Sequence, residues 1–225
     1  MDIAGAVPQQ ARPSARTAAP DQETSWLDSL LDKTILCPAH LPPSTTDRMR
    51  GLVALRREQL AAADDLVRRR YAWRGYALSN ESRAAAAPLV TLLAQSEDDV
   101  VGTLTVRPGG VYGLFAEQSY GAEIEELRGR GRRVGELVRL ALEEGSDWRR
   151  ALDALVRSAY VITRFMYALT DVVIEVNPRH ARFYQRVFGF AVGATERFCS
   201  RVGAPSVLLL LELEAFGKRL ESLKL

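Results

Sequence analysis

The stretch DVVIEVNPRHARFYQRVFGF, residues 171–190, predicts a strand, a turn and a helix in direct succession. Residues 171–176 are β-branched and apolar, as in a buried central strand. Asn177-Pro178 ends that strand, and Pro178 suits the first position of a helix because its missing N–H would have no partner there. Apolar side chains then recur at helical spacing as far as Gly189, which predicts the end of the helix and the start of another strand.

The same periodicity predicts a series of elements on either side of this unit. In chain order these are a helix over 52–71, strands over 88–94 and 100–106, an acidic helical segment over 120–128, a strand over 134–142, a helix from 147 that Ser146 caps, the strand and helix quoted above, and strands over 191–198 and 206–213. The first two strands form a hairpin. After the first helix, the main order is therefore β-β-β-α-β-α-β-β.

Composition divides the chain into three parts. Residues 1–22 are rich in Ala, Pro, Gln and Arg without any period and predict a disordered tail. Residues 23–48 predict an extra helix, with an apolar stripe that includes Trp26, followed by a Pro-rich linker. Residues 49–225 predict one folded domain, for which a hydrophobic content of 47% over the 225-residue chain is ordinary.

Charge and cysteine usage narrow the classes of function. The formal net charge of +2 gives no reason to expect nucleic acid or a membrane as partner. No apolar run reaches the roughly 20 residues of a membrane span, and the N-terminal residues lack the apolar core of a secretory signal. Cys37 and Cys199 lie far apart in sequence, which fits a reducing compartment without a disulfide. We therefore expect a cytoplasmic protein.

Five residues of the opening stretch resemble the acyl-donor motif of the GNAT acyltransferase superfamily: Asn177, Ala181, Tyr184, Gly189 and Phe190. The resemblance implies an α/β (α+β) fold in which a mixed central sheet, flanked by helices, splays open between its fourth and fifth strands. The alternative is an ordinary β-α-β unit in which Tyr184 is a packed aromatic residue.

The loop that binds coenzyme A in common GNAT enzymes has a different composition here. That family loop has the form Gln/Arg-x-x-Gly-x-Gly/Ala, and its backbone N–H groups hold a pyrophosphate at a helix N-terminus. The corresponding segment, LEEGSDWRRAL over 142–152, has one glycine and carries Glu143, Glu144 and Asp147. Those carboxylates would repel a pyrophosphate.

A second resemblance fits the chain better. LRGRGRRVGELVRLALEE (127–144), with Glu136 and Arg139, and the Arg-rich RRRYAWRGYAL (68–78) are similar to segments of N-acyl amino acid synthases and, more distantly, of acyl-homoserine-lactone synthases. This implies an N-acyltransferase that takes a medium or long acyl group from phosphopantetheine on acyl carrier protein and gives it to an amino acid or related amine, with no tightly bound cofactor. The alternatives are a coenzyme A-dependent N-acetyltransferase that uses acyl-CoA and a non-catalytic acyl-binding module.

The resemblance also suggests roles for single residues. Glu136 is the candidate base, and its alternative is a structural ion pair with Arg139 or Arg133. Strict alternation would place Glu136 and Arg139 on opposite faces of the strand, whereas a β-bulge would bring both to one face. Arg139 would then bind the acceptor carboxylate. Tyr184 would protonate the leaving thiolate or hold the pantetheine arm. Asn177 would bind a pantetheine amide or cap the turn.

Further candidates lie on the helices that follow these motifs. Trp73 and Arg74 would form part of the acceptor site. Four arginines would contact the donor, at a helix N-terminus or along a helix that faces an acidic carrier protein, and their alternative is a solvated surface: Arg149, Arg150, Arg179 and Arg182. Cys37 and His40 have no second ligand pair to complete a tetrahedral site, so no metal is expected.

Overall fold

The computed structural model describes residues 49–76, 89–145 and 147–220. The predicted tail over 1–22, and the predicted helix and linker over 23–48, lie outside the described residues. The described elements are β1 (Met49–Val53), α2 (Arg57–Trp73), β2 (Val90–Ser96), β3 (Asp99–Arg107), η1 (Gly110–Tyr112), α4 (Glu117–Gly129), β4 (Val134–Leu142), α5 (Trp148–Val161), η2 (Ile162–Met166), β5 (Asp171–Val176), α6 (Pro178–Phe188), β6 (Ala191–Cys199), β7 (Ala204–Glu212) and α7 (Leu213–Leu220).

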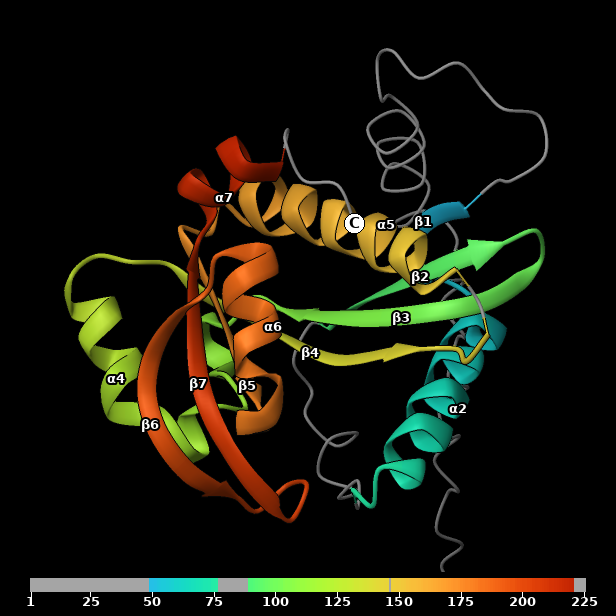
Figure 1. The fold of residues 1–225 in the computed structure, drawn as a ribbon. Helices are drawn as coiled ribbons and strands as arrows, with labels where there is room; N and C mark the ends of the chain where they lie inside the picture. The colour runs from blue at the N-terminus through green and yellow to red at the C-terminus, as the bar shows by residue number, and fades with distance from the viewer. Residues whose placement is uncertain (1–48, 77–88, 146, 221–225) are drawn as a thin grey trace, which may run out of the picture.

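The described strands form one mixed sheet in the order β1-β2-β3-β4-β5-β7-β6. Neighbouring strands are antiparallel except β4 and β5, which are parallel. Only Val134–Glu136 of β4 pairs with Asp171–Val173 of β5, and beyond Glu136 the two strands separate. Figure 1 shows β3 and β4 running across the view while β6 and β7 run nearly upright. This confirms the predicted GNAT sheet, splayed between its fourth and fifth strands.

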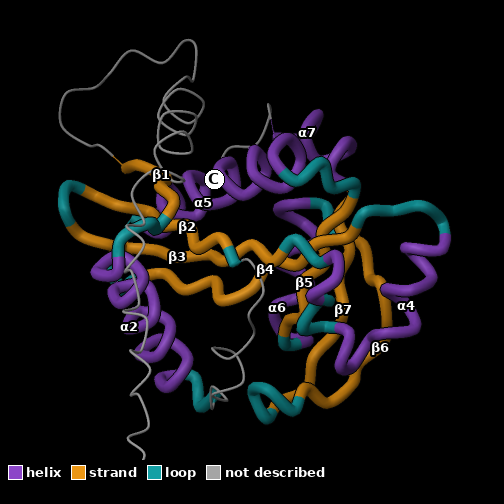
Figure 2. The backbone as a smooth tube through the Cα atoms, turned by 180° about the vertical axis from the view of Figure 1, so that it is seen from behind, coloured by secondary structure: helices purple, strands orange, loops and turns teal. Residues whose placement is uncertain are grey.

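Helices cover both faces of the first half of the sheet (Figure 2). Leu155 of α5 packs with Leu92 and Leu104 in one buried cluster. On the opposite face, Leu66 of α2 packs with Ala141 of β4. Alternating side chains of one strand point to opposite faces, so each strand of this half supplies both layers.

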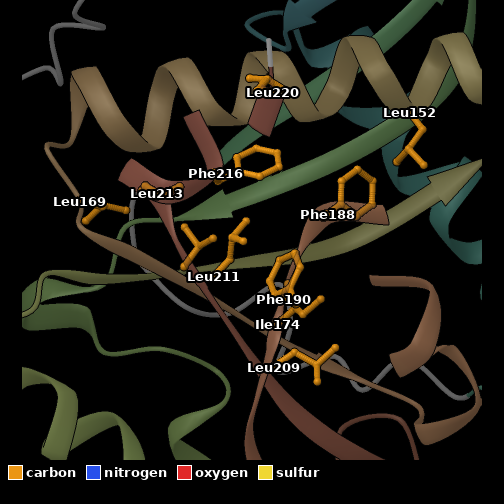
Figure 3. Packing of buried hydrophobic residues seen from close by; sticks show 11 residues of the cluster. Leu152, Leu169, Ile174, Phe188, Phe190, Leu209, Leu211, Leu213, Phe216 and Leu220 are labelled. Carbon is orange, nitrogen blue, oxygen red and sulfur yellow. The ribbon is translucent and has the colours of Figure 1, made fainter. Parts of the chain in front are cut away.

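The second half of the sheet has its own core beneath α5, α6 and α7 (Figure 3). Ile174 and Leu209 come from the strands, Phe188 from α6, and Phe216 from α7. Complete burial of one such side chain contributes roughly 1.5–3 kcal/mol. α6 is held at both ends, because Asn177 accepts the N–H of Arg179 and Gly189 adopts a left-handed conformation that closes the helix. This is the unit that the opening sequence stretch predicted.

At the start of the domain the predicted bounds of the first helix were wrong, and at its end a helix was not predicted. Met49–Val53 is a strand paired with β2, and the first helix begins at Arg57 instead of residue 52. Gly51 makes this possible, since a Cβ there would lie 2.9 Å from the carbonyl oxygen of Ala154 in α5. At the other end, α7 follows β7 without a break, and its buried Leu213, Phe216 and Leu220 recur at helical spacing.

Two smaller findings complete the fold. The cap of α5 is Asp147, whose side chain accepts the N–H of Arg150, while the predicted cap Ser146 lies outside the described residues. Within the part of the chain that the structure describes, no helix combines the length and the apolar composition needed to cross a membrane.

Candidate functional site

A cavity of about 550 Å³ lies between the separating strands β4 and β5. Its volume falls within the roughly 300–1,000 Å³ of small-molecule sites. Leu152 and Phe188, which belong to the core shown in Figure 3, form part of its wall. Most of the inner wall is apolar and comes from β4, α5, β5, α6 and α7: Leu137, Leu140, Leu142, Leu152, Val156, Val172, Ile174, Phe183, Phe188 and Phe216.

Glu136 lies in the wall of this cavity, at the point where β4 leaves β5. Its side chain is fully buried. The carboxylate accepts the backbone N–H of Phe115 at 2.6 Å and that of Ala116 at 3.2 Å. Burial raises the pKa of Glu136 to about 7, although the nearby charge of Arg201 and the Phe115 N–H act in the opposite direction. A carboxyl group that titrates near neutral pH suits a general base.

Because the pKa of Glu136 is raised, we expect the difference in unfolding free energy between the wild type and a Glu136→Gln variant to depend on pH. Between about pH 4.5 and 7 the unfolded chain loses this proton while the folded protein retains it, so the free energy of unfolding falls as pH rises. The shift corresponds to about 3 kcal/mol. Compared with a Glu136→Gln variant, the wild type should therefore lose about that much stability across this range. Urea unfolding at several pH values measures the difference, and a constant difference between the two proteins would contradict the raised pKa.

A β-bulge follows Glu136 in β4. Val138 pairs with Thr105 and Ala141 with Thr103, so two residues of β4 lie opposite Leu104 alone. One of the two, Arg139, has a φ of 60°, in the left-handed region. The bulge changes the alternation of the strand, and Glu136 and Arg139 both line the cavity. The guanidinium of Arg139 forms an ion pair with Asp64 of α2.

Sequence reasoning missed three charged residues around Glu136. Arg107 of β3 is the cross-strand partner of Glu136. Arg201, in the turn between β6 and β7, forms an ion pair with Glu175 of β5. The guanidinium carbons of Arg107 and Arg201 lie 4.0 Å and 5.1 Å from the centre of the Phe115 ring. No local period marks these positions, because chain segments far apart in sequence bring them together.

The GNAT-like motif of α6 contributes Tyr184 and Asn177 to the same cavity. Burial raises the pKa of Tyr184 to about 12, so its hydroxyl stays protonated at neutral pH. Both polar atoms of the Asn177 side chain form hydrogen bonds. Its oxygen accepts the N–H of Arg179 at 3.2 Å, and its nitrogen donates to the carbonyl of Pro205 at 3.3 Å. Capping, the alternative considered for Asn177, is therefore one of its roles.

Acidic side chains at one end of the cavity are tied to α2. Arg69 pairs with Glu143 at 2.8 Å, and Arg70 pairs with Glu144 at 2.9 Å. Glu143, Glu144 and Gly145 all line the cavity, as does Trp148 at the start of α5.

Comparisons with known proteins agree with this fold. The family model described as "N-acyl amino acid synthase FeeM" matches residues 62–212. The chain belongs to this family. It is an N-acyltransferase. No curated protein matches the chain.

Among solved structures, FeeM, an N-acyl amino acid synthase from uncultured soil microbes, has a TM-score of 0.70 with 23% identity, over 77% of this chain and 95% of that one. An acyl-CoA N-acyltransferase from Pseudomonas aeruginosa has a TM-score of 0.53 with 12% identity, over 72% and 99%. The AHL synthase LasI has a TM-score of 0.51 with 14% identity, over 74% and 91%. At these identities the structures show the shared fold.

Some residues predicted for the N-acyltransferase site lie away from the cavity. Arg74 lines it, whereas its neighbour Trp73 is 69% exposed and stacks with Arg70. The four arginines predicted to contact the donor lie on the exposed surface of α5 and α6: Arg149, Arg150, Arg179 and Arg182. Arg150 pairs with Asp147, and Arg179 donates to the hydroxyl of Tyr76 at 3.1 Å.

The described part of this N-acyltransferase contains no candidate metal site. Within residues 49–76, 89–145 and 147–220, no three His, Cys, Asp or Glu residues gather as metal ligands would. Cys37 and His40 lie outside these ranges.

Proposed function

We propose that this N-acyltransferase transfers a medium or long fatty acyl group from an acyl carrier protein to the amine of an amino acid or related small molecule. The observation that carries the proposal is the apolar cavity that begins beside Glu136 and continues between β4 and β5. An acyl chain gains about 0.8 kcal/mol for each methylene buried in such a space. A cavity lined by leucine, valine and phenylalanine therefore favours a long acyl group over an acetyl group.

The reaction forms an amide from a thioester. The amine nitrogen attacks the thioester carbonyl carbon, and Glu136 takes the amine proton directly or through a water molecule. The carbon–sulfur bond then breaks, and the protonated hydroxyl of Tyr184 supplies a proton to the leaving thiolate. The irregular backbone at the β4 bulge offers an N–H to polarise the carbonyl oxygen. The transfer is direct, without an acyl-enzyme intermediate.

The end of the cavity lined by Glu143, Glu144 and Gly145 is better suited to a carrier-protein donor than to coenzyme A. Glu143 accepts the N–H of Glu144 at 3.3 Å, and Asp147 accepts that of Arg150 at 3.3 Å. Carboxylates of the protein thus already accept hydrogen bonds from backbone N–H groups that would otherwise bind a diphosphate. The phosphopantetheine arm carries no diphosphate. Acyl carrier proteins are acidic, and the exposed arginines of α5 and α6 provide a complementary docking surface.

A comparison of three donors with the same acyl chain tests this function: acyl carrier protein, pantetheine and coenzyme A. With a panel of amino acids, mass spectrometry should find N-acyl amino acids, and the carrier-protein donor should give the highest kcat/KM. Neutralising Glu143 and Glu144 with glutamine should raise the use of acyl-CoA relative to acyl-pantetheine about tenfold, because two charges near the diphosphate cost on the order of 1 kcal/mol or more.

The matched control is Glu125→Gln with Glu126→Gln on α4, where both acids are exposed and paired with arginine. This pair should leave the donor preference unchanged. Equal wild-type use of acyl-CoA and acyl carrier protein would favour the coenzyme A-dependent alternative. Acyl binding without product from any donor and amine would favour a non-catalytic acyl-binding module.

A further inference from the structure

The turn between β6 and β7 brings Arg201 into the cavity wall, next to the proposed base. Arg201 and Glu136 both line the cavity, and the positive charge of Arg201 acts to lower the pKa of Glu136 against the larger effect of burial. The guanidinium lies against Phe115, and its side chain is 16% exposed. A positive charge is therefore fixed at the place where the acceptor amine must meet Glu136.

Only part of the hydrogen-bonding capacity of Arg201 is used by the protein. A guanidinium carries five N–H donors. Nη2 donates to Glu175. Nε is buried without a partner, and Nη1 makes no hydrogen bond within the described residues. Because buried donors are normally paired, a partly buried guanidinium with donors to spare, at a cavity wall, is suited to an anionic ligand.

Among the described residues, three other arginines line the cavity: Arg70, Arg74 and Arg139. Arg70 forms an ion pair with Glu144. Arg139, the residue predicted from sequence, forms an ion pair with Asp64 of α2, as Arg201 does with Glu175. Arg74 lies at the end of α2, near Tyr71 and Tyr184, and its side chain is exposed. Arg201 differs from these three residues because its buried Nε has no partner and because its charge acts on Glu136 more than theirs do.

Charge balance points in the same direction. Glu136 and Glu175 face Arg107 and Arg201, so the cluster contains two acidic and two basic groups. An amino acid carries one ammonium and one carboxylate on the same carbon. Its ammonium can pair with Glu136, and its carboxylate can accept hydrogen bonds from the N–H groups of Arg201 that have no partner in the protein.

We infer that Arg201 binds the carboxylate of the acceptor and thereby selects amines that carry an acid group next to the amine. This inference rests on the proposed function, because it concerns the acceptor of that same reaction. The carboxylate takes no part in the bond changes. Arg201 orients the amine toward the thioester carbon and toward Glu136.

The test compares one amino acid with the amine that lacks only its carboxylate group. The wild type should show a clear preference for the amino acid in kcat/KM. In Arg201→Gln the ratio between the two acceptors should fall about 10- to 100-fold, the worth of a charged hydrogen bond. Arg201→Lys keeps the charge without the planar fork and should lose part of the preference. Arg197→Gln is the matched control, since Arg197 of β6 also pairs with a glutamate but does not line the cavity.

Stability effects are separated with a double variant, Glu175→Gln with Arg201→Gln, which removes the Glu175 carboxylate together with its ion-pair partner. It should fold and show the same loss of preference. An unchanged ratio in the folded double variant, or a loss that appears in Arg139→Gln or Arg74→Gln instead, would overturn the assignment. A wild type that acylates both acceptors equally would also overturn it while leaving the transfer reaction standing. Failure to acylate either acceptor would remove the proposed function, and this assignment with it.

Discussion

Replacing Glu136 with glutamine is expected to lower kcat for acyl transfer by about 10²- to 10⁴-fold, the usual contribution of a positioned general base. Glutamine has nearly the same shape and keeps a carbonyl oxygen for one of the two N–H groups, Phe115 or Ala116, that the carboxylate now binds. It has no basic oxygen to take the proton of the amine. Steady-state assays at saturating acceptor measure the loss.

The pH profile separates a base from a structural ion pair. Below about pH 7 the buried Glu136 is protonated and has no capacity to accept a proton, so the wild-type rate should rise through that pH and then level off. The glutamine variant should lack this rise. A variant that is folded, as judged by its thermal midpoint, and that retains full turnover with the wild-type profile would show that Glu136 only holds residues 115–116 in place.

Much of the fold could be predicted from local sequence patterns because the interactions that define the predicted strands and helices are themselves local. The strand, proline, helix and glycine of residues 171–190 lie within one continuous stretch, and the structure has them where the periodicity placed them. Met49–Val53 was missed because its strand character comes from pairing with β2, which five residues alone do not reveal. The bulge in β4 was expected from the family resemblance and lies at Arg139.

The residues of the candidate site also fall into two groups: those within local sequence motifs and those that only the assembled sheet brings together. Glu136 and Tyr184 belong to motifs, so they could be selected from the sequence, and both line the cavity. Arg201 lies in the short turn between β6 and β7, and its position beside Glu136 depends on the whole sheet being assembled. Trp73 was selected as an aromatic residue near an Arg-rich helix end, yet the helix turns it outward. Sequence spacing gives the face of an element only when the register of that element is known.

Filling the cavity from α5 should shorten the acyl chain that the N-acyltransferase accepts. Val156 lines the apolar part of the cavity, and a Val156→Trp variant would occupy space that the distal methylenes need. Exclusion of about four methylenes removes roughly 3 kcal/mol of burial, so kcat/KM for a hexadecanoyl donor should fall on the order of 100-fold. A butanoyl donor does not extend as far, and its kcat/KM should change little. Product analysis with a series of donors on the same carrier measures this shift in chain length.

The control is the same substitution at Val192 of β6, which is 59% exposed and does not line the cavity. Val192→Trp should leave the preference for long chains intact. The comparison between donors matters more than the absolute rate, because a misfolded variant loses both donors equally whereas a filled cavity loses only the long one. An equal loss with both donors in a folded Val156→Trp protein would mean that the acyl chain lies elsewhere. The space between β4 and β5 would then be only a packing defect, in which tryptophan should raise the thermal midpoint by replacing empty volume with contacts.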